Sequence, residues 1–303
     1  MNEQTLHLRR DGLTLSAGLY GEDDAPLVIL LHGFPDTPYS WDRVVPHLVA
    51  AGYRVLTPWL RGYTPESAKR GARYDLIAVA EDIEAWRQHL VADQVHLVGH
   101  DWGAVVAMVL GDTPPPAAAH AGPWKTLSLL AVPPLPHASQ WRALLPYLPR
   151  QLRLSAYMPV MQLGFSHRLL TRNNAEYVRQ IWRKWSPGWH FDDADFAPAR
   201  LVFSDPALAW ASTRYYRNLF TLHRATTRQT FARMARRFRV PTLALAGAQD
   251  GCMSAQTHRI IGNAPAQRGL LRAVQLPDCG HFLQAEKPDE VARCLLEHFQ
   301  RVD

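Results

Sequence analysis

An aspartate between two glycines has the clearest chemical potential in this chain. Residues 99–103 read Gly-His-Asp-Trp-Gly, after an apolar run at 94–98 and before a small, apolar run at 103–110. The glycines allow a sharp turn from strand to helix, which leaves Asp101 exposed at the edge of a sheet. A carboxylate held there can attack carbon and form an ester, and the matching electrophiles are epoxides and alkyl halides. The alternative is that Asp101 only caps the following helix.

Two further residues could assist such a nucleophile. Asp250 follows an apolar run at 243–246, and His281 follows another at 273–276. A histidine that is oriented by a carboxylate can take a proton from water. Taken singly, Asp250 reads as a turn residue and His281 as a buried structural histidine. Because all three residues follow separate predicted strands, in the order nucleophile, acid, histidine, we predict a catalytic triad.

A fourth element follows the apolar run at 27–31, where the chain reads His-Gly-Phe-Pro. A loop there can direct the backbone amide of Phe34 to the same point as the amide of Trp102. Two such amides form an oxyanion hole. Only the N–H groups are needed, so we predict that both residues act by position.

Alternating strand and helix signals surround these residues. They predict an α/β fold with a mostly parallel sheet and helices on both faces. Residues 5–20 alternate around Asp11-Gly12 and predict a β-hairpin. The other predicted strands are 27–31, 54–57, 94–98, 126–131, 243–246 and 273–276; the helices are 41–51, 76–90 and 103–110; and 113–119 (TPPPAAA) is a loop.

The alternation stops at residues 133–136, Pro-Pro-Leu-Pro. From there to about Arg224 the chain has helical stretches rich in Trp, Tyr and Arg and no convincing strand. A helical insertion within an α/β core is best explained as a cap over the site. We therefore predict a core formed by residues 1–132 and 225–303, with a helical cap at 133–224.

Charge is distributed unevenly along the chain. The net charge is +6, yet residues 133–230 alone hold 13 Lys and Arg against 5 Asp and Glu. A basic segment can bind nucleic acid or acidic lipids. Here the arginines are scattered singly among apolar residues, which favours a solvated helical face and no nucleic-acid partner.

Composition sets further expectations. No run approaches the roughly 18 apolar residues of a membrane span, and the N-terminus lacks the layout of a signal peptide. A cytoplasmic location is expected. The three cysteines, Cys252, Cys279 and Cys294, form neither a metal-binding spacing nor a disulfide framework. We expect no metal and no cofactor, and a homodimer stays open.

Four segments together resemble the epoxide hydrolases of the α/β-hydrolase fold: HGFPDTPYSW, GHDWGA, GAQDGCM and GHFLQAEKPDEV. The resemblance covers nearly the whole chain. The combination of HGFP and GHDWG is typical of epoxide hydrolases and haloalkane dehalogenases. It implies a covalent ester on Asp101 that is hydrolysed by water activated by His281 and Asp250.

The resemblance also implies two cap tyrosines that donate hydrogen bonds to the epoxide oxygen. Tyr157 stands five residues before a Gln, and Tyr216 heads a Tyr-Arg-Asn sequence. Gly164 follows where a Pro-Gly is common in the family. Tyr215 adjoins Tyr216, so either could be the second donor, and ordinary cap packing is the alternative for each tyrosine.

Two other functions remain as alternatives to an epoxide hydrolase that acts on an apolar epoxide. A haloalkane dehalogenase would share the triad and Trp102, but it generally needs a second halide donor where Phe34 stands. A non-catalytic ligand receptor usually lacks part of the triad, which is complete here. The predicted cap is rich in aromatic residues, which indicates an apolar substrate without identifying it: Trp182, Trp185, Trp189, Phe203 and Trp210.

Overall fold

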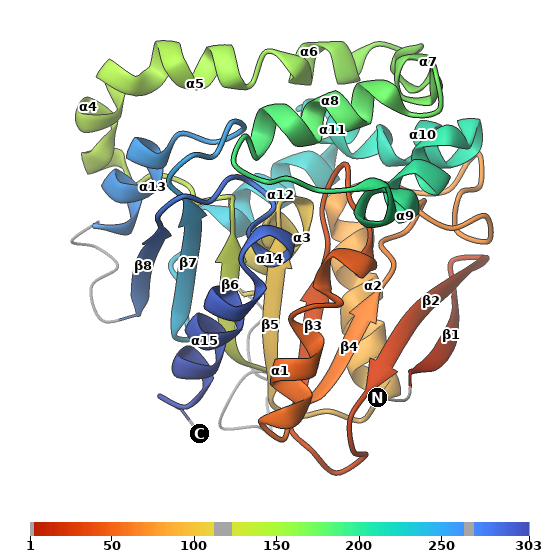
Figure 1. Ribbon diagram of the computed structural model, residues 1–303, viewed down its shortest axis with the longest axis vertical. Coiled ribbons are helices and arrows are strands. Elements are labelled where there is room, and N and C mark those ends of the chain that lie inside the picture. Colours follow the sequence, from red (N-terminus) through yellow and green to blue (C-terminus); the bar gives the residue numbers. More distant parts are fainter. Residues whose placement is uncertain (1–2, 112–122, 264–269, 303) are drawn as a thin grey trace.

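The computed structural model describes residues 3–111, 123–263 and 270–302, so the predicted loop at 113–119 lies outside the described residues. An eight-stranded sheet crosses the molecule (Figure 1), in the order β1-β2-β4-β3-β5-β6-β7-β8. The strands are β1 (Gln4–Arg10), β2 (Leu13–Tyr20), β3 (Leu27–Leu31), β4 (Arg54–Pro58), β5 (Val95–His100), β6 (Trp124–Leu130), β7 (Thr242–Gly247) and β8 (Leu271–Leu276).

Six strands, from β4 to β8 in the order of the sheet, run parallel, and the predicted hairpin β1–β2 is antiparallel at one edge. Every residue of β3 and β5 is buried. Strands that are covered on both faces need apolar side chains on both, which explains why β3 reads as a continuous apolar run. The predicted α/β architecture is confirmed.

The pairing of β3 with β5 is the part of the topology that builds the site. Leu31 lies opposite Gly99 in this parallel pair. The loop after β3 and the turn after β5 therefore leave the sheet side by side at its carboxyl edge. This register brings residues about 70 positions apart in sequence to one point.

Helices cover both faces of the sheet (Figure 1). One layer contains α1, α14 and α15, and the opposite layer contains α2, α3 and α12. Each layer encloses its own apolar core. The core helices are α1 (Val45–Ala50), α2 (Leu76–His89), α3 (Trp102–Leu110), α12 (Ala225–Met234), α13 (Ala255–Gly262), α14 (Leu283–Glu286) and α15 (Pro288–Phe299).

Nine α-helices lie between β6 and β7. Eight of them, α4 to α11, run above the carboxyl ends of the parallel strands, and the ninth is α12 of the core (Figure 1). The described part of this insertion contains no strand, as the sequence predicted. The domain bounds at 132 and 224 stay a prediction. The helices are α4 (Trp141–Leu144), α5 (Leu148–Leu154), α6 (Tyr157–Gln162), α7 (Ser166–Thr171), α8 (Glu176–Trp185), α9 (Asp193–Ser204), α10 (Pro206–Ser212) and α11 (Arg214–Leu219), with 3-10 turns at Ala138–Gln140 and Leu145–Tyr147.

One predicted helix is wrong in its extent. Residues 41–51 do not form a continuous helix, because a 3-10 turn at Pro38–Trp41 is followed by turn residues before α1 begins at Val45. Pro46 lies in the first turn of α1, where its missing N–H is tolerated. In a helix that began at residue 41, the same proline would clash with the carbonyl group of the preceding turn. Among the described residues, no helix is long and apolar enough to cross a bilayer.

Candidate active site

Asp101 occupies the sharp turn between β5 and α3 that the glycines predicted. Its backbone has φ 51° and ψ −112°, a strained conformation for a residue other than glycine. A Cβ atom on Gly99 would lie 2.1 Å from the carbonyl oxygen of Gly103. Only glycine fits such a close approach of two backbone segments. The Asp101 side chain makes no capping hydrogen bond to α3, so the helix-capping alternative is excluded.

The structure brings the three predicted triad residues together. The Nδ1 of His281 lies 2.9 Å from Oδ2 of Asp250, and its Nε2 lies 3.7 Å from Oδ2 of Asp101. All three side chains are buried. Because the Nδ1–H group of His281 donates a hydrogen bond to Asp250, the Nε2 atom faces Asp101 and the space in front of it.

Two contacts that the sequence did not predict hold this pair in place. The Oδ1 of Asp250 accepts hydrogen bonds from the amides of Cys252 and Met253, at 2.6 and 2.9 Å. The amide of His281 donates to the carbonyl of Trp185 at 3.0 Å. The ring of Trp185 lies 4.9 Å from that of His281. The last turn of α8 in the insertion therefore packs directly on the catalytic histidine candidate.

Charge in this buried cluster favours an imidazolium ion. Burial alone disfavours the charged form of His281, but the carboxylates of Asp250 and Asp101 outweigh it and raise the His281 pKa to about 10. Burial alone would raise the pKa of Asp101, yet the charge of the nearby His281, whose Nε2 lies 3.7 Å from Oδ2, holds it below its usual value. Asp101 is therefore an ionised carboxylate at neutral pH, as a nucleophile must be.

The backbone amide of Phe34, the first predicted oxyanion-hole donor, points at the Asp101 carboxylate. Its N–H donates to Oδ1 of Asp101 at 2.8 Å. The amide of Trp102 belongs to the first turn of α3, where backbone N–H groups lack partners within the helix; its role stays a prediction. A Cβ atom on Gly33 would lie 2.4 Å from the Cβ of Asp101, so only glycine lets the Phe34 loop approach this closely.

We expect Gly33→Ala to slow turnover strongly. The added methyl group would push the Phe34 loop away from Asp101 and remove one oxyanion donor, a loss of about 100- to 1,000-fold in kcat. Steady-state kinetics on any accepted substrate measure the effect. Gly164→Ala is the matched control, because a Cβ there meets nothing within 4 Å. Equal activity of both variants would show that the Phe34 amide is not needed.

Tyr216, and not Tyr215, faces Asp101. Its ring lies 4.8 Å from that of Trp102 and 5.2 Å from that of Phe34. Its hydroxyl is buried and has no hydrogen-bond partner among the described residues. The ring of Tyr157 lies 5.8 Å away. Two phenols from α6 and α11 thus meet beside the carboxylate.

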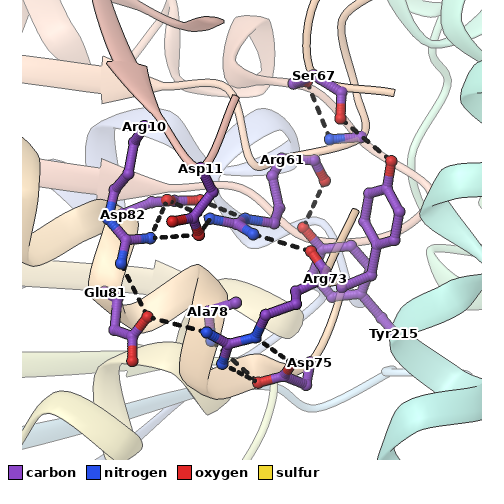
Figure 2. A network of polar contacts seen from close by, with 12 residues as sticks. Arg10, Asp11, Arg61, Ser67, Arg73, Asp75, Ala78, Glu81, Asp82 and Tyr215 are labelled. Carbon is purple, nitrogen blue, oxygen red and sulfur yellow. Dashed lines mark hydrogen bonds and ion pairs between the residues drawn. The ribbon is translucent and has the colours of Figure 1, made fainter. Parts of the chain in front are cut away.

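Tyr215 points instead to Arg61 in the loop after β4 (Figure 2). Its hydroxyl donates to the carbonyl oxygen of Arg61 at 2.7 Å. Arg61 is itself buried and pairs with the buried Asp82, with Nε 2.6 Å from Oδ2. Arg10 joins the same carboxylate at 3.0 Å. This ion-pair network fixes the loop after β4 and, through Tyr215, the orientation of α11.

Both site phenols are neutral donors at physiological pH. Burial raises the pKa of Tyr157 and of Tyr216 well above the ordinary value, and the charge of Asp101 adds to the shift. The Tyr157 hydroxyl lies 3.6 Å from Sγ of Cys252. A neutral phenol can donate a hydrogen bond to a developing alkoxide.

The aromatic residues of the insertion take different places. Trp185 packs against both His281 and Tyr157, and Phe203 packs against Phe34. Trp182 and Trp189 stack on each other at 5.1 Å. Trp210 instead packs under the guanidinium groups of Arg70 and Arg214.

A second polar group behind the triad was missed by the sequence reasoning. The Nε2 of His100 donates to the carbonyl oxygen of His281 at 3.0 Å, and its Nδ1 lies 3.6 Å from Oδ2 of Asp36. Gln284 donates to the same Asp36 oxygen at 3.1 Å. Asp36 directly follows the HGFP sequence and His100 precedes Asp101, so their positions were the available signal. His100 thus holds the carbonyl group of His281, and Asp36 lies on the other side of the His100 ring.

Comparison with known proteins identifies the family of the chain. Residues 26–288 match the family model of the alpha/beta hydrolase fold. Epoxide hydrolase A of Mycobacterium tuberculosis is 31% identical over 95% of this chain and 94% of its own. The AB hydrolase superfamily protein YfhM of Bacillus subtilis is 26% identical over 96% of both chains. The crystal structure of Epoxide Hydrolase A from Mycobacterium thermoresistibile shares the fold, with a TM-score of 0.74 and 22% identity over 100% of this chain and 99% of that chain.

The chain therefore belongs to the α/β hydrolase fold family and, within it, to the epoxide hydrolases.

Proposed function

We propose that this protein hydrolyses an apolar epoxide to a vicinal diol through a covalent ester on Asp101. The observation that carries the proposal is the placement of an ionised carboxylate in a strand–helix turn, facing His281 on one side and two neutral phenols on the other. A carboxylate nucleophile with phenol donors suits an epoxide, because the oxygen that leaves the attacked carbon stays bonded to the neighbouring carbon and needs a proton. The family relatives named as epoxide hydrolases support it.

In the first half-reaction, Asp101 attacks an epoxide carbon. Oδ1 is held by the Phe34 amide, so Oδ2 is the free nucleophile. A bond forms between Oδ2 and carbon as the ring carbon–oxygen bond breaks. The leaving alkoxide takes hydrogen bonds, and then a proton, from Tyr157 and Tyr216. Without such donors an alkoxide is a poor leaving group.

In the second half-reaction, His281 activates water. Ester formation removes the charge of Asp101, one of the two carboxylates that raise the His281 pKa. The imidazolium therefore loses its proton more easily and becomes a base, still oriented by Asp250. Water then attacks the ester carbonyl, and the oxyanion at Oδ1 is stabilised by the Phe34 and Trp102 amides. The proton that the imidazolium releases restores the phenol that protonated the first alkoxide. The bond between the ester carbonyl carbon and the alkyl oxygen then breaks, and the departing oxygen takes the proton that His281 removed from water. The acid proton left on Asp101 returns to His281, so epoxide and water give the diol and the starting enzyme.

Haloalkane dehalogenation is the second candidate, because the indole Nε1 of Trp102 is buried without a partner among the described residues. Such a donor could hold a halide ion. At the second donor position, however, the side chain is the ring of Phe34, which packs against Phe203 and Tyr216 and offers no N–H. Tyr216 lies in the same space and favours an oxygen leaving group.

We expect loss of the phenol hydroxyls to slow ester formation and not ester hydrolysis. Tyr157→Phe and Tyr216→Phe should each slow it by roughly 10- to 1,000-fold, the scale of one positioned donor. The double variant should nearly stop it, because the alkoxide then has no proton source. Rapid mixing with an aryl epoxide measures the step. Tyr147→Phe is the matched control and should retain the rate, because this tyrosine of the insertion is exposed.

The same variants separate the candidate functions. A dehalogenase depends on the Trp102 indole and needs no phenol. If the double tyrosine variant stayed fast while Trp102→Phe lost activity on a bromoalkane, the epoxide assignment would be wrong. Absence of turnover by the wild-type protein across terminal, aryl and internal epoxides and haloalkanes would instead favour a ligand receptor.

A further inference from the structure

The outer helices of the insertion expose an unusual number of large apolar side chains. Seven of the thirteen exposed large apolar residues in the described chain lie between positions 141 and 165. We call the exposed surface of residues 141–172 the outer face. Figure 1 places α5 and α6 at the edge of the molecule that is farthest from the sheet. The seven residues are Trp141, Leu145, Tyr147, Leu148, Leu152, Leu163 and Phe165.

The same segment is purely basic. No Asp or Glu occurs from 137 to 175, a stretch that contains five arginines. All five arginines are exposed, and none forms an ion pair with another described residue, whereas Arg61 and Arg87 elsewhere are paired. They are Arg142, Arg150, Arg153, Arg168 and Arg172.

Apolar and basic side chains alternate within α5. Leu148 and Leu152 stand four residues apart and are exposed, while Gln151 turns inward and donates to the carbonyl of Cys252. Arg153 follows directly and is exposed. Long arginine side chains beside apolar ones can reach phosphate groups while the apolar ones enter a less polar layer.

We propose that the outer face docks on the surface of an anionic lipid bilayer. Leucine and aromatic side chains enter the boundary between headgroups and acyl chains, where Trp and Tyr are favoured. The arginines bind lipid phosphates, to which an all-basic face is complementary. The helices of the insertion lie on the membrane and do not cross it.

A second copy of the chain is a poorer occupant of this face. A symmetric dimer brings the same patch of each copy together, so five arginines without an ion-pair partner among the described residues would meet five others. Like charges brought together across an interface are unfavourable. A bilayer of anionic lipids satisfies both the apolar and the basic side chains.

Docking would also bring the site close to its substrate, a point that rests on the proposed function. Tyr157 begins α6, three residues after α5 ends, and its ring packs on Trp185 above His281. Apolar epoxides dissolve in acyl chains. A protein held on the bilayer by α5 would meet them at a high local concentration.

Flotation of the intact protein with vesicles tests the proposal without any substrate. Vesicles of phosphatidylcholine mixed with phosphatidylglycerol should carry the protein, and vesicles of phosphatidylcholine alone should carry much less. High salt should weaken the binding, because the arginine contribution is screened. Activity is not needed for this readout, so failure of the epoxide mechanism would leave the result unchanged.

Matched variants give the proposal its specificity. Arg150→Gln with Arg153→Gln should weaken vesicle binding by about 10- to 30-fold, and Leu152→Ser by roughly tenfold. Arg9→Gln and Val91→Ser, at exposed sites on β1 and after α2, should bind as the wild type does. Absence of binding to anionic vesicles would overturn the proposal, as would equal binding by all variants. The proposal would also be overturned if the protein did not bind vesicles and sedimentation showed a dimer that the outer-face variants dissociate.

Discussion

Asp101→Ala is expected to abolish diol formation while the protein stays folded. The substitution removes the atom that forms the ester, and neither His281 nor the tyrosines can replace it. The glycines that permit the turn remain, so the strand–helix connection is kept. Chromatography of the diol measures activity, and a thermal melt followed by circular dichroism checks the fold.

A second variant controls for the strained backbone of this position. Asn is tolerated at positive φ better than Ala, and Asp101→Asn keeps the shape of the side chain without its charge. Immediate product formation by Asp101→Asn should be as low as for Asp101→Ala. Appreciable diol formation by a folded Asp101→Ala protein would contradict the covalent mechanism.

His281→Gln is expected to open the epoxide and then stop at the ester. Ring opening uses Asp101 and the phenols, whereas only the second half-reaction needs a base. Intact-mass spectrometry after mixing with substrate should show a gain equal to the substrate mass. His281 is also what holds the Asp101 pKa low; without it burial raises that pKa. The adduct should therefore form faster as the pH is raised.

His258→Gln is the matched control for this experiment. His258 is also buried, but its Nε2 donates to the carbonyl of Ala131 and it has no role in the proposed chemistry. It should turn over without an adduct. An inactive His281→Gln protein that forms no adduct at any pH would show that His281 acts before ester formation or not as the base.

Local pattern was enough to predict the sheet, the turn and the triad. Strands such as β3 are continuous apolar runs, and the glycines at 99 and 103 are required by backbone contacts that any sharp strand–helix turn makes. The order of Asp101, Asp250 and His281 after parallel strands predicts their meeting, because the carboxyl ends of such strands share one edge. The predicted helix at 41–51 is wrong in its extent because Pro46 is tolerated only in the first turn of a helix, and α1 therefore begins at Val45.

Only the tertiary structure decided which side chains face that edge. Tyr215 and Tyr216 are neighbours in sequence, and on a helix they point about 100° apart. Nothing local fixes the rotation of α11; the buried Arg61–Asp82 pair does, because Tyr215 binds the Arg61 carbonyl. The contact of His100 with the carbonyl of His281 joins residues 181 positions apart. Periodicity can predict a helix, but the direction of each side chain is set by what packs against it.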